Sequence, residues 1–252
     1  MNIFGSTRSR VCRDHALIAS DSFVRGPQPG WEKTECIILI SPQMGARFSQ
    51  YLALMEPGAI AGPAPMGVER VIYVLEGRLS LTIPRTGEQF LTSGGYAFFP
   101  PGAKIQVQAI TPIRLNVFEK IYVPLSGNIS PQFLFGQEQN VASTPFMGDP
   151  GAVLKSLLPT DFSFDMAVNI FTFSPGATLP LVEVHVMEHG LFMLQGQGVY
   201  RLGDSWYPVR EGDGIWMASY CPQWFVAMGT NPARYLYYKD VNRHPLHLEF
   251  KK

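Results

Sequence analysis

Short apolar runs separated by glycine and proline recur along this chain, and their pattern predicts β-strands. Cys36–Ile40 is continuously apolar, while Phe164–Phe173 alternates apolar and polar positions. Alternation with period two fits a strand, because a helix repeats only about every 3.6 residues. A strand, glycine turn and strand span Glu69–Ile83, and a comparable run spans Leu191–Leu202. We therefore expect an all-β chain, with one short helix at Gly151–Leu158.

The two halves of the chain repeat this pattern. Gly196 lies 119 residues after Gly77, and Gly212 lies 118 residues after Gly94. Each glycine stands between two apolar runs, which is typical of a turn. Short, regularly spaced strands with Gly and Pro turns indicate a sandwich or a small barrel. The sequence thus predicts two copies of one β unit of roughly 100 residues.

The chain divides into four expected parts. Residues 1–30 are polar, with turn signals, and form an N-terminal arm that packs on the body. Residues 31–125 form the first barrel and residues 161–252 the second. Residues 126–160 contain Pro, Gly and Asn throughout and are expected to form a linker.

Composition narrows the range of functions. Apolar residues make up 46% of the 252 residues, charged residues only 16%, and the net charge is zero. This balance argues against charge-driven binding to nucleic acid or to a membrane surface. No apolar run approaches the ~20 residues that span a bilayer, and the basic N-terminus lacks the apolar stretch of a signal peptide. We expect a soluble cytoplasmic protein.

The cysteines predict no disulfide framework. Cys12, Cys36 and Cys221 are odd in number, far apart and without a CxxC pair. We interpret each as a buried, reduced thiol rather than a disulfide or zinc ligand. His15 has no partner nearby in the sequence and receives no role.

The stretch that carries candidate chemistry is Glu183, His185 and His189, at positions i, i+2 and i+6. Even spacing places all three on one face of a strand, whereas on a helix positions i and i+2 point about 200° apart. Two imidazoles and one carboxylate can hold a divalent transition metal with open positions. The alternative is a pair of buried structural histidines. Glu188 is interpreted as a surface charge.

Several motifs together resemble a known family. Strand, glycine turn and strand, followed by an E-G-D turn and a proline-bounded strand, resemble a cupin, and the repeat resembles a bicupin of two tandem jelly-roll barrels. The motifs E-x-H-x-x-x-H-G, G-x-G-V-Y, C-P-Q-W and Y-x-Y-x-K-D are similar to those of the (S)-ureidoglycine aminohydrolases. These are manganese bicupins of allantoin breakdown in purine catabolism, and the resemblance spans nearly the whole chain.

The resemblance implies a metal site in the second barrel. Its ligands would be Glu183, His185, His189 and, from the C-P-Q-W motif, Gln223. Oxygen donors with two imidazoles suit Mn²⁺ or Fe²⁺ better than other divalent metals.

The same resemblance implies hydrolytic deamination of (S)-ureidoglycine to (S)-ureidoglycolate and ammonia, by a hydrolase that acts on C–N bonds. Glu183, Gln223, Tyr235 and Lys239 would bind the substrate, and Tyr200 would line the pocket. Glu183, Tyr235 and Lys239 would be catalytic. By period two, Tyr235 and Lys239 share a strand face, where the lysine can pair with a small carboxylate. Without the resemblance, Lys239 fits a solvated strand end and Tyr200 a packing residue.

The first copy lacks these ligands. The repeat offset places Ala64, Met66 and Arg70 where the second copy has its carboxylate and imidazoles. None of the three is a suitable metal donor, and arginine is permanently cationic. We expect a first barrel without metal, in which Arg70 forms a structural ion pair.

Two other classes of function stay open at this point. The same ligand set would serve another metal-dependent cupin enzyme, such as a dioxygenase or a sugar-acid isomerase. A sensor or storage cupin without turnover is the third class. We expect a small-molecule substrate, no nucleic-acid or membrane partner, and a homo-oligomer.

Overall fold

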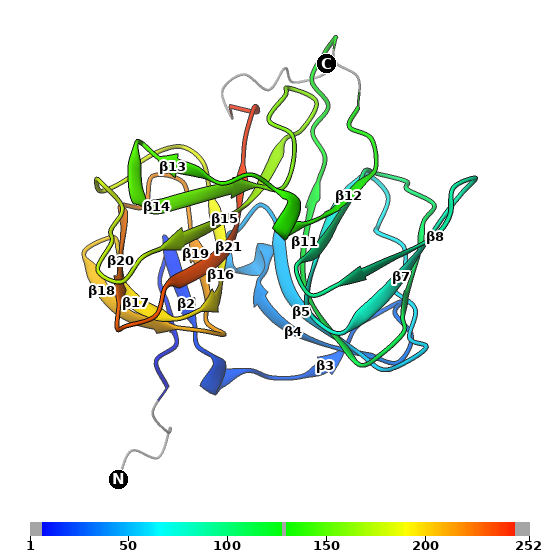
Figure 1. The fold of residues 1–252 in the computed structure, drawn as a ribbon, viewed down its shortest axis with the longest axis horizontal. Helices are drawn as coiled ribbons and strands as arrows, with labels where there is room; N and C mark the ends of the chain where they lie inside the picture. Colours follow the sequence, from blue (N-terminus) through cyan, green and yellow to red (C-terminus); the bar gives the residue numbers. More distant parts are fainter. Residues whose placement is uncertain (1–6, 128–129, 245–252) are drawn as a thin grey trace.

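The structure is a computed structural model that describes residues 7–127 and 130–244. Over these residues the chain forms β-strands arranged as two sandwiches side by side, as Figure 1 shows. The described residues contain no α-helix, only three short 3-10 turns at Ser20–Ser22, Pro42–Met44 and Glu138–Asn140. Within them no helix is long and apolar enough to cross a membrane.

The first sandwich consists of a seven-stranded and a three-stranded antiparallel sheet, with Leu79, Leu81 and Val117 fully buried in its core. The larger sheet has the order β12 (Leu134–Gln137), β9 (Gly95–Phe99), β6 (Val68–Glu76), β11 (Ile113–Ile121), β5 (Ser49–Met55), β4 (Thr34–Ile40) and β3 (Gly26–Pro27). The smaller sheet has the order β10 (Gln106–Ala109), β7 (Arg78–Ile83) and β8 (Gly87–Thr92).

The second sandwich has an eight-stranded and a three-stranded antiparallel sheet around the buried Phe173, Phe225 and Leu202. The larger sheet has the order β1 (Arg10–Val11), β2 (His15–Ile18), β19 (Gly214–Met217), β16 (His189–Gln195), β21 (Ala233–Asp240), β15 (Met166–Phe173), β14 (Asp149–Ser156) and β13 (Thr144–Phe146). The smaller sheet has the order β18 (Ser205–Arg210), β17 (Gln197–Leu202) and β20 (Gln223–Met228).

The predicted repeat is confirmed at the turns that connect the two sheets of each sandwich. Gly77 and Gly196 both have positive φ, 89° and 76°. A Cβ at Gly77 would lie 2.2 Å from the carbonyl oxygen of Pro112, and one at Gly196 would lie 2.5 Å from that of Pro232. Only glycine combines this backbone conformation with so close an approach. The two positions are therefore equivalent in the fold, as the sequence offset indicated.

The segment expected to be a linker contributes strands to both sandwiches. Its β12 pairs with β9 of the first sandwich, whereas β13 and β14 extend the large sheet of the second. The predicted helix at Gly151–Leu158 is wrong, because β14 occupies most of it. Ala152 and Leu154 alternate onto the core face and pair with Phe173 and Phe171, so burial decides the conformation.

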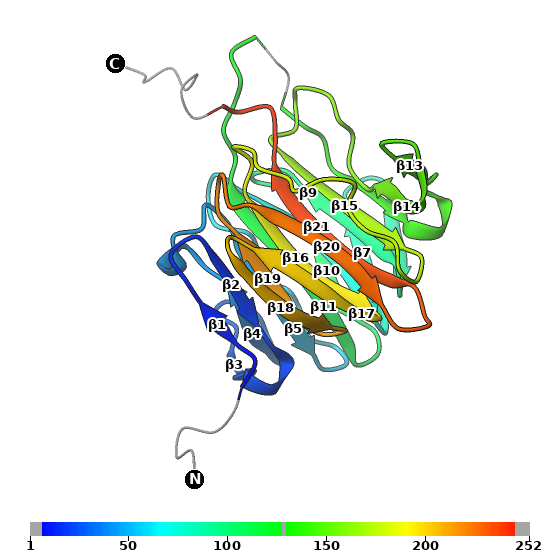
Figure 2. The same ribbon diagram turned by 90° about the vertical axis from the view of Figure 1, so that its left-hand side faces the viewer.

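A third core joins the two sandwiches through their large sheets. Phe48 and Phe118 of the first stack on Tyr238 of the second, with ring centroids 4.1 and 5.9 Å away. Trp216 and Val168 are buried in the same cluster. The N-terminal arm reinforces this junction: β1 and β2 extend the second large sheet and β3 the first, and the three strands lie together at one edge in Figure 2.

Candidate metal and substrate site

A small cavity of about 110 Å³ opens inside the second sandwich. All the residues singled out from the sequence line it: Glu183, His185, His189, Tyr200, Gln223, Tyr235 and Lys239. A larger groove of about 930 Å³ lies elsewhere, beside Lys33 and Glu35 of the first sandwich, and none of these residues faces it. The small cavity is the one in which metal-binding and acid–base groups converge.

The local conformation differs from the predicted single strand. β16 begins only at His189, and Glu183 forms an isolated bridge with Gln223 through backbone hydrogen bonds of 2.9 and 3.0 Å. The predicted surface charge at Glu188 is also wrong, since this residue is buried. Its carboxylate accepts hydrogen bonds from the indole of Trp216 at 2.7 Å and from the backbone of Arg47. Residues 184–188 lie outside a strand, so even spacing along one strand is not what brings the three side chains together.

The predicted face of β21 is confirmed. His189 lies opposite Lys239, Leu191 opposite Tyr237, and Met193 opposite Tyr235. Residues at period two on both strands therefore point into the same cavity.

The residue after His189 must be glycine for a packing reason. A Cβ at Gly190 would lie 2.4 Å from the ring of Phe48, which belongs to the first sandwich. The junction between the sandwiches thus presses directly on the backbone that positions His189, and this backbone is held from both sides.

The two histidines direct their Nε2 atoms at each other, 3.1 Å apart. The backbone carbonyl of Met187 accepts a hydrogen bond from Nδ1 of His185 at 3.1 Å. This bond places a proton on Nδ1 of His185, so in the neutral ring its Nε2 is an acceptor. A histidine held through its other nitrogen is the usual arrangement at a metal, and two Nε2 atoms this close can share one cation.

Gln223 joins this pair from β20. Its side-chain amide lies 3.1 Å from Nε2 of His185, and the residue is buried. An amide presents either its oxygen or its nitrogen after a rotation of 180°, so the same position can supply an oxygen ligand. Three donors therefore converge on one point.

Glu183 stands apart from this convergence. Glu183, His185 and His189 do not bring three donor atoms within 4.8 Å of one another, so the carboxylate lies beyond that distance from at least one imidazole. Burial raises the pKa of Glu183, and the neighbouring His185 and Lys239 reduce this shift. Burial also lowers the pKa of His189 well below its usual value, which keeps this ring neutral.

Tyrosines form the other wall of the cavity. Burial raises the pKa of Tyr200, Tyr235 and Tyr237 above the usual tyrosine value, so their hydroxyls stay protonated and can donate hydrogen bonds. The ring of Tyr237 also lies 5.5 Å from that of His189 and stacks on Phe171. Half-buried Lys239 completes this wall with a positive charge.

Sequence reasoning missed part of the lining. Phe146, Phe171, Met187, Leu191, Met217 and Tyr237 also face the cavity. Tyr237 carried a signal, because it shares the period-two face of Tyr235 and Lys239. Phe146 carried none, since it comes from β13 in the segment expected to be a linker.

The predictions for the cysteines and His15 need correction in part. All three cysteines are free, as expected, but Cys12 is exposed while Cys36 and Cys221 are buried. His15 does have partners: its Nδ1 lies 2.9 Å from the carboxylate of Asp14, and its Nε2 lies 2.8 Å from the hydroxyl of Tyr207.

The first sandwich confirms the expected ion pair of Arg70. Its guanidinium donates to Glu119 at 2.6 Å and to the carbonyl oxygen of Gly62 at 2.6 Å. It also lies 5.0 Å from the ring of Trp31. Met66, at one of the other two equivalent positions, is fully exposed.

Comparison with known proteins shows to which family the chain belongs. The cupin domain family matches residues 169–238, which include His185, His189 and Gln223. A probable (S)-ureidoglycine aminohydrolase from Oryza sativa is 44% identical over 96% of this chain and 78% of its own length. The (S)-ureidoglycine aminohydrolase of Escherichia coli is 35% identical over 90% of this chain and 88% of its own. The chain belongs to the (S)-ureidoglycine aminohydrolase family. The resemblance inferred from the motifs, and with it the assignment to an enzyme family, is confirmed.

Solved structures agree with the bicupin fold. A putative glyoxylate induced protein from Pseudomonas aeruginosa has a TM-score of 0.87 at 33% identity, covering 97% of this chain and 94% of that protein. Protein Ylba from E. coli has a TM-score of 0.83 at 32% identity, over 95% and 96%. The Bacillus subtilis oxalate decarboxylase, described with Mn(II) centres, has a TM-score of 0.69 at 11% identity over 90% and 78% of the chains, and shares the fold alone.

Proposed function

We propose that this protein hydrolyses (S)-ureidoglycine to (S)-ureidoglycolate and ammonia at one divalent metal in the second barrel. The observation that carries the proposal is the convergence of the two imidazole Nε2 atoms and the Gln223 amide beside Lys239 and Tyr235. Nitrogen and oxygen donors without sulfur suit Mn²⁺ or Fe²⁺. The small cavity suits a substrate of few atoms, well below the ~300 Å³ of an ordinary ligand pocket.

The proposed ligands are His185, His189, Gln223 and Glu183. A metal bound there would supply Lewis acidity and a fixed orientation for the substrate. The backbone of Glu183 is held against that of Gln223, which places its side chain on the same cavity as the other proposed ligands. A carboxylate that is loosely held can also carry protons.

The remaining residues provide recognition and proton transfer. Lys239 pairs with the substrate carboxylate, and Tyr235 donates a hydrogen bond to the same anion. Tyr200 closes the wall behind Tyr235, at a ring distance of 6.3 Å. During the reaction the C–N bond to the amine breaks and a C–O bond to water forms. Glu183 takes a proton from that water and returns one to the departing ammonia.

Two measurements test this function. Metal-loaded protein is supplied with ureidoglycine made in place by allantoate amidohydrolase, and ammonia release is followed against spontaneous decay. We expect ammonia well above that decay, only with metal bound. Ammonia at the spontaneous rate in a protein that holds one metal would refute the activity.

Glu183→Gln separates the two roles of Glu183. The amide keeps a ligand oxygen and the shape of the side chain but cannot carry the proton. We expect turnover to fall by about 10²-fold or more while the metal content falls much less. Turnover at the wild-type rate would remove Glu183 from the chemistry. An equal loss of metal and turnover would leave it a ligand only.

A further inference from the structure

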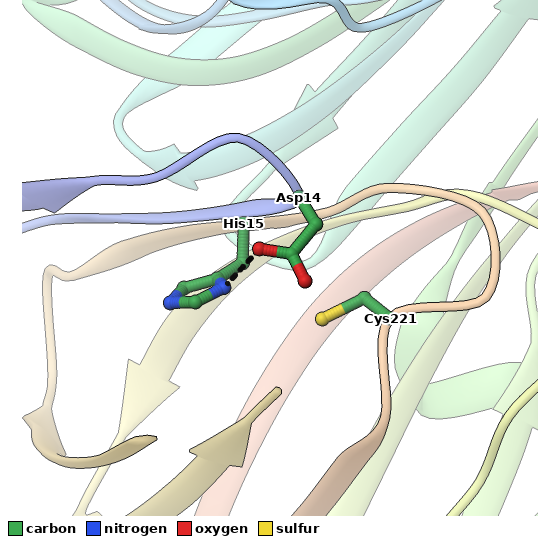
Figure 3. Close-up of side chains that lie close together, drawn as sticks. All are labelled: Asp14, His15 and Cys221. Carbon is green, nitrogen blue, oxygen red and sulfur yellow. Dashed lines mark hydrogen bonds and ion pairs between the residues drawn. The ribbon is translucent and has the colours of Figure 1, made fainter. Parts of the chain in front are cut away.

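A second cluster of metal-binding groups lies outside the cavity. Among the described residues, Asp14, His15 and Cys221 form the one set of three carboxylate, imidazole and thiol groups whose donor atoms all lie within 4.8 Å of one another. Figure 3 shows the His15 ring and the sulfur of Cys221 on either side of the Asp14 carboxylate. Two come from the N-terminal arm and the third from the turn before β20.

The backbone brings these groups together through specific contacts. His15 lies opposite Met217 in the β2–β19 pair, and the amide of Ala218 donates to the carbonyl oxygen of Asp14 at 2.9 Å. Tyr220, with a φ of 64°, occupies the left-handed region that non-glycine residues rarely adopt. This strained residue directly precedes Cys221 and turns the chain back toward the arm.

The immediate surroundings also suit a cation. His15 and Cys221 are 5% and 3% exposed, whereas the side chain of Asp14 is 49% exposed and leaves a path from solvent. Gly203 lies beside them: a Cβ there would be 3.6 Å from Asp14 Oδ2 and 3.8 Å from His15 Nδ1. The absence of that side chain keeps space open next to both donors.

The orientation of His15 fits ligation through Nδ1. Nε2 lies 2.8 Å from the Tyr207 hydroxyl, which can accept its N–H when Nδ1 is bare. An imidazole that ligates by one nitrogen and is oriented through the other is the usual arrangement around zinc. A cation at Nδ1 would take the place of the proton that His15 now shares with Asp14.

We propose that Asp14, His15 and Cys221 form a second metal site that takes Zn²⁺ and fastens the N-terminal arm to the turn carrying Gln223. Zinc accepts thiolate, imidazole and carboxylate together, in a tetrahedral set with one position left for water. The thiol of Cys221 loses its proton on binding, and that proton goes to solvent. The proposed ligands of the first site, His185, His189, Gln223 and Glu183, include no sulfur, so the two sites differ in the metal they favour.

Cobalt distinguishes the two sites, because a thiolate on Co²⁺ produces a charge-transfer absorption that nitrogen and oxygen ligands do not. The full-length protein is stripped of metal and titrated with Co²⁺. We expect this absorption to appear, to persist in His189→Ala, and to disappear when Zn²⁺ is added. It should be lost in Cys221→Ser and kept in Cys36→Ser, the other buried cysteine.

Two further variants keep the test decisive if Cys221→Ser folds poorly. Asp14→Asn changes a half-exposed side chain of the same shape and should weaken binding by about tenfold or more. Cys12→Ser removes the exposed thiol and should change nothing. Cobalt bound without the thiolate absorption, or an absorption that depends on Cys12 rather than Cys221, would overturn the proposal. Unchanged affinity in Asp14→Asn would overturn it as well.

Discussion

The two barrels share one strand framework but carry side chains of different charge at equivalent positions. In the first, Arg70 of β6 lies opposite Glu119 of β11; in the second, His189 of β16 lies opposite Lys239 of β21. Arg70 is a cation paired with an anion at 2.6 Å. Lys239 is a cation that faces a neutral ring instead. The first barrel has therefore neutralised the charge at this position, whereas the second keeps donors and a positive charge available there.

This difference teaches what the fold does and does not supply. Both barrels have the same glycine turn, at Gly77 and Gly196, and the same antiparallel register behind it. The strand framework fixes where two opposing side chains meet. The identity of those side chains decides whether they pair with each other or remain available to bind a ligand. Function therefore depends on a few positions added to a common framework.

The strongest test of this comparison is to exchange the pairs. His189→Arg combined with Lys239→Glu recreates the ion pair of the first barrel in the second. We expect the first metal site to be lost and ammonia release to fall at least about 10³-fold, because several kcal/mol of metal assistance disappears. Metal analysis and the ammonia assay measure both effects, and circular dichroism checks the fold.

The reverse exchange is the matched control. Arg70→His with Glu119→Lys should gain no metal, because Ala64 and Met66 offer no ligand. A metal bound by this variant would contradict the view that Ala64 and Met66 keep the first barrel without metal. A metal retained by the first exchange would contradict a role for His189 as a ligand.

A smaller effect, on stability, is expected when only one partner of the Arg70–Glu119 ion pair is removed. Arg70→Met leaves Glu119 and the carbonyl of Gly62 without their donor in a largely buried place. We expect a loss of about 3 kcal/mol in unfolding free energy, measured with urea, and no change in ammonia release. Arg70→Met with Glu119→Leu should recover most of the loss. A double variant as unstable as the single one would show that the ion pair itself stabilises the barrel.

The smallest expected effect concerns two equivalent glutamates, Glu69 and Glu188. Glu188 is paired with Arg47 and Trp216, whereas neither carboxylate oxygen of Glu69 has a hydrogen-bond partner and Lys120 Nζ lies 4.0 Å from one of them. Burial, together with the neighbouring Asp165, raises the pKa of Glu69 to about 10. The folded state then holds a proton that the unfolded chain releases above about pH 4.5, so stability falls as the pH rises between these values.

Glu69→Gln should remove this dependence. Between pH 5 and pH 8 we expect the variant to gain about 1 kcal/mol or more relative to wild type, measured as the change in urea midpoint. Glu188→Gln should lose stability instead, because the guanidinium of Arg47 loses one of its two charged partners and keeps only Asp240. The same pH dependence in wild type and Glu69→Gln would contradict a protonated Glu69.

Much of the fold was predictable because its signals are local. Glycine turns and apolar alternation at Gly77, Gly196 and Phe164–Phe173 follow from residues next to one another. The strand β14 was not predictable, since its core contacts with Phe171 and Phe173 depend on another segment. The buried Glu188 is similar: its partners Arg47 and Trp216 lie 141 and 28 residues away.

The residues of the candidate site were predictable where a family motif or the period-two pattern of a strand included them. The family motifs led to Gln223, and period two led to Lys239. The chain between Glu183 and His189 was assigned a regular strand, although the strand begins only at His189 and Glu183 forms an isolated bridge. Phe146 and the Asp14, His15 and Cys221 cluster were out of reach, because topology alone brings those residues to their partners.

The N-terminal arm also sets a condition on the order of folding. β2 finds its hydrogen-bonding partner in β19, some 200 residues later in the chain. During synthesis the arm therefore emerges long before the strand that will hold it, and the second sheet gains its outer strands late. Contacts of such sequence separation slow folding, since a long loop must close before they form. Arm docking thus marks completion of the second barrel rather than its beginning.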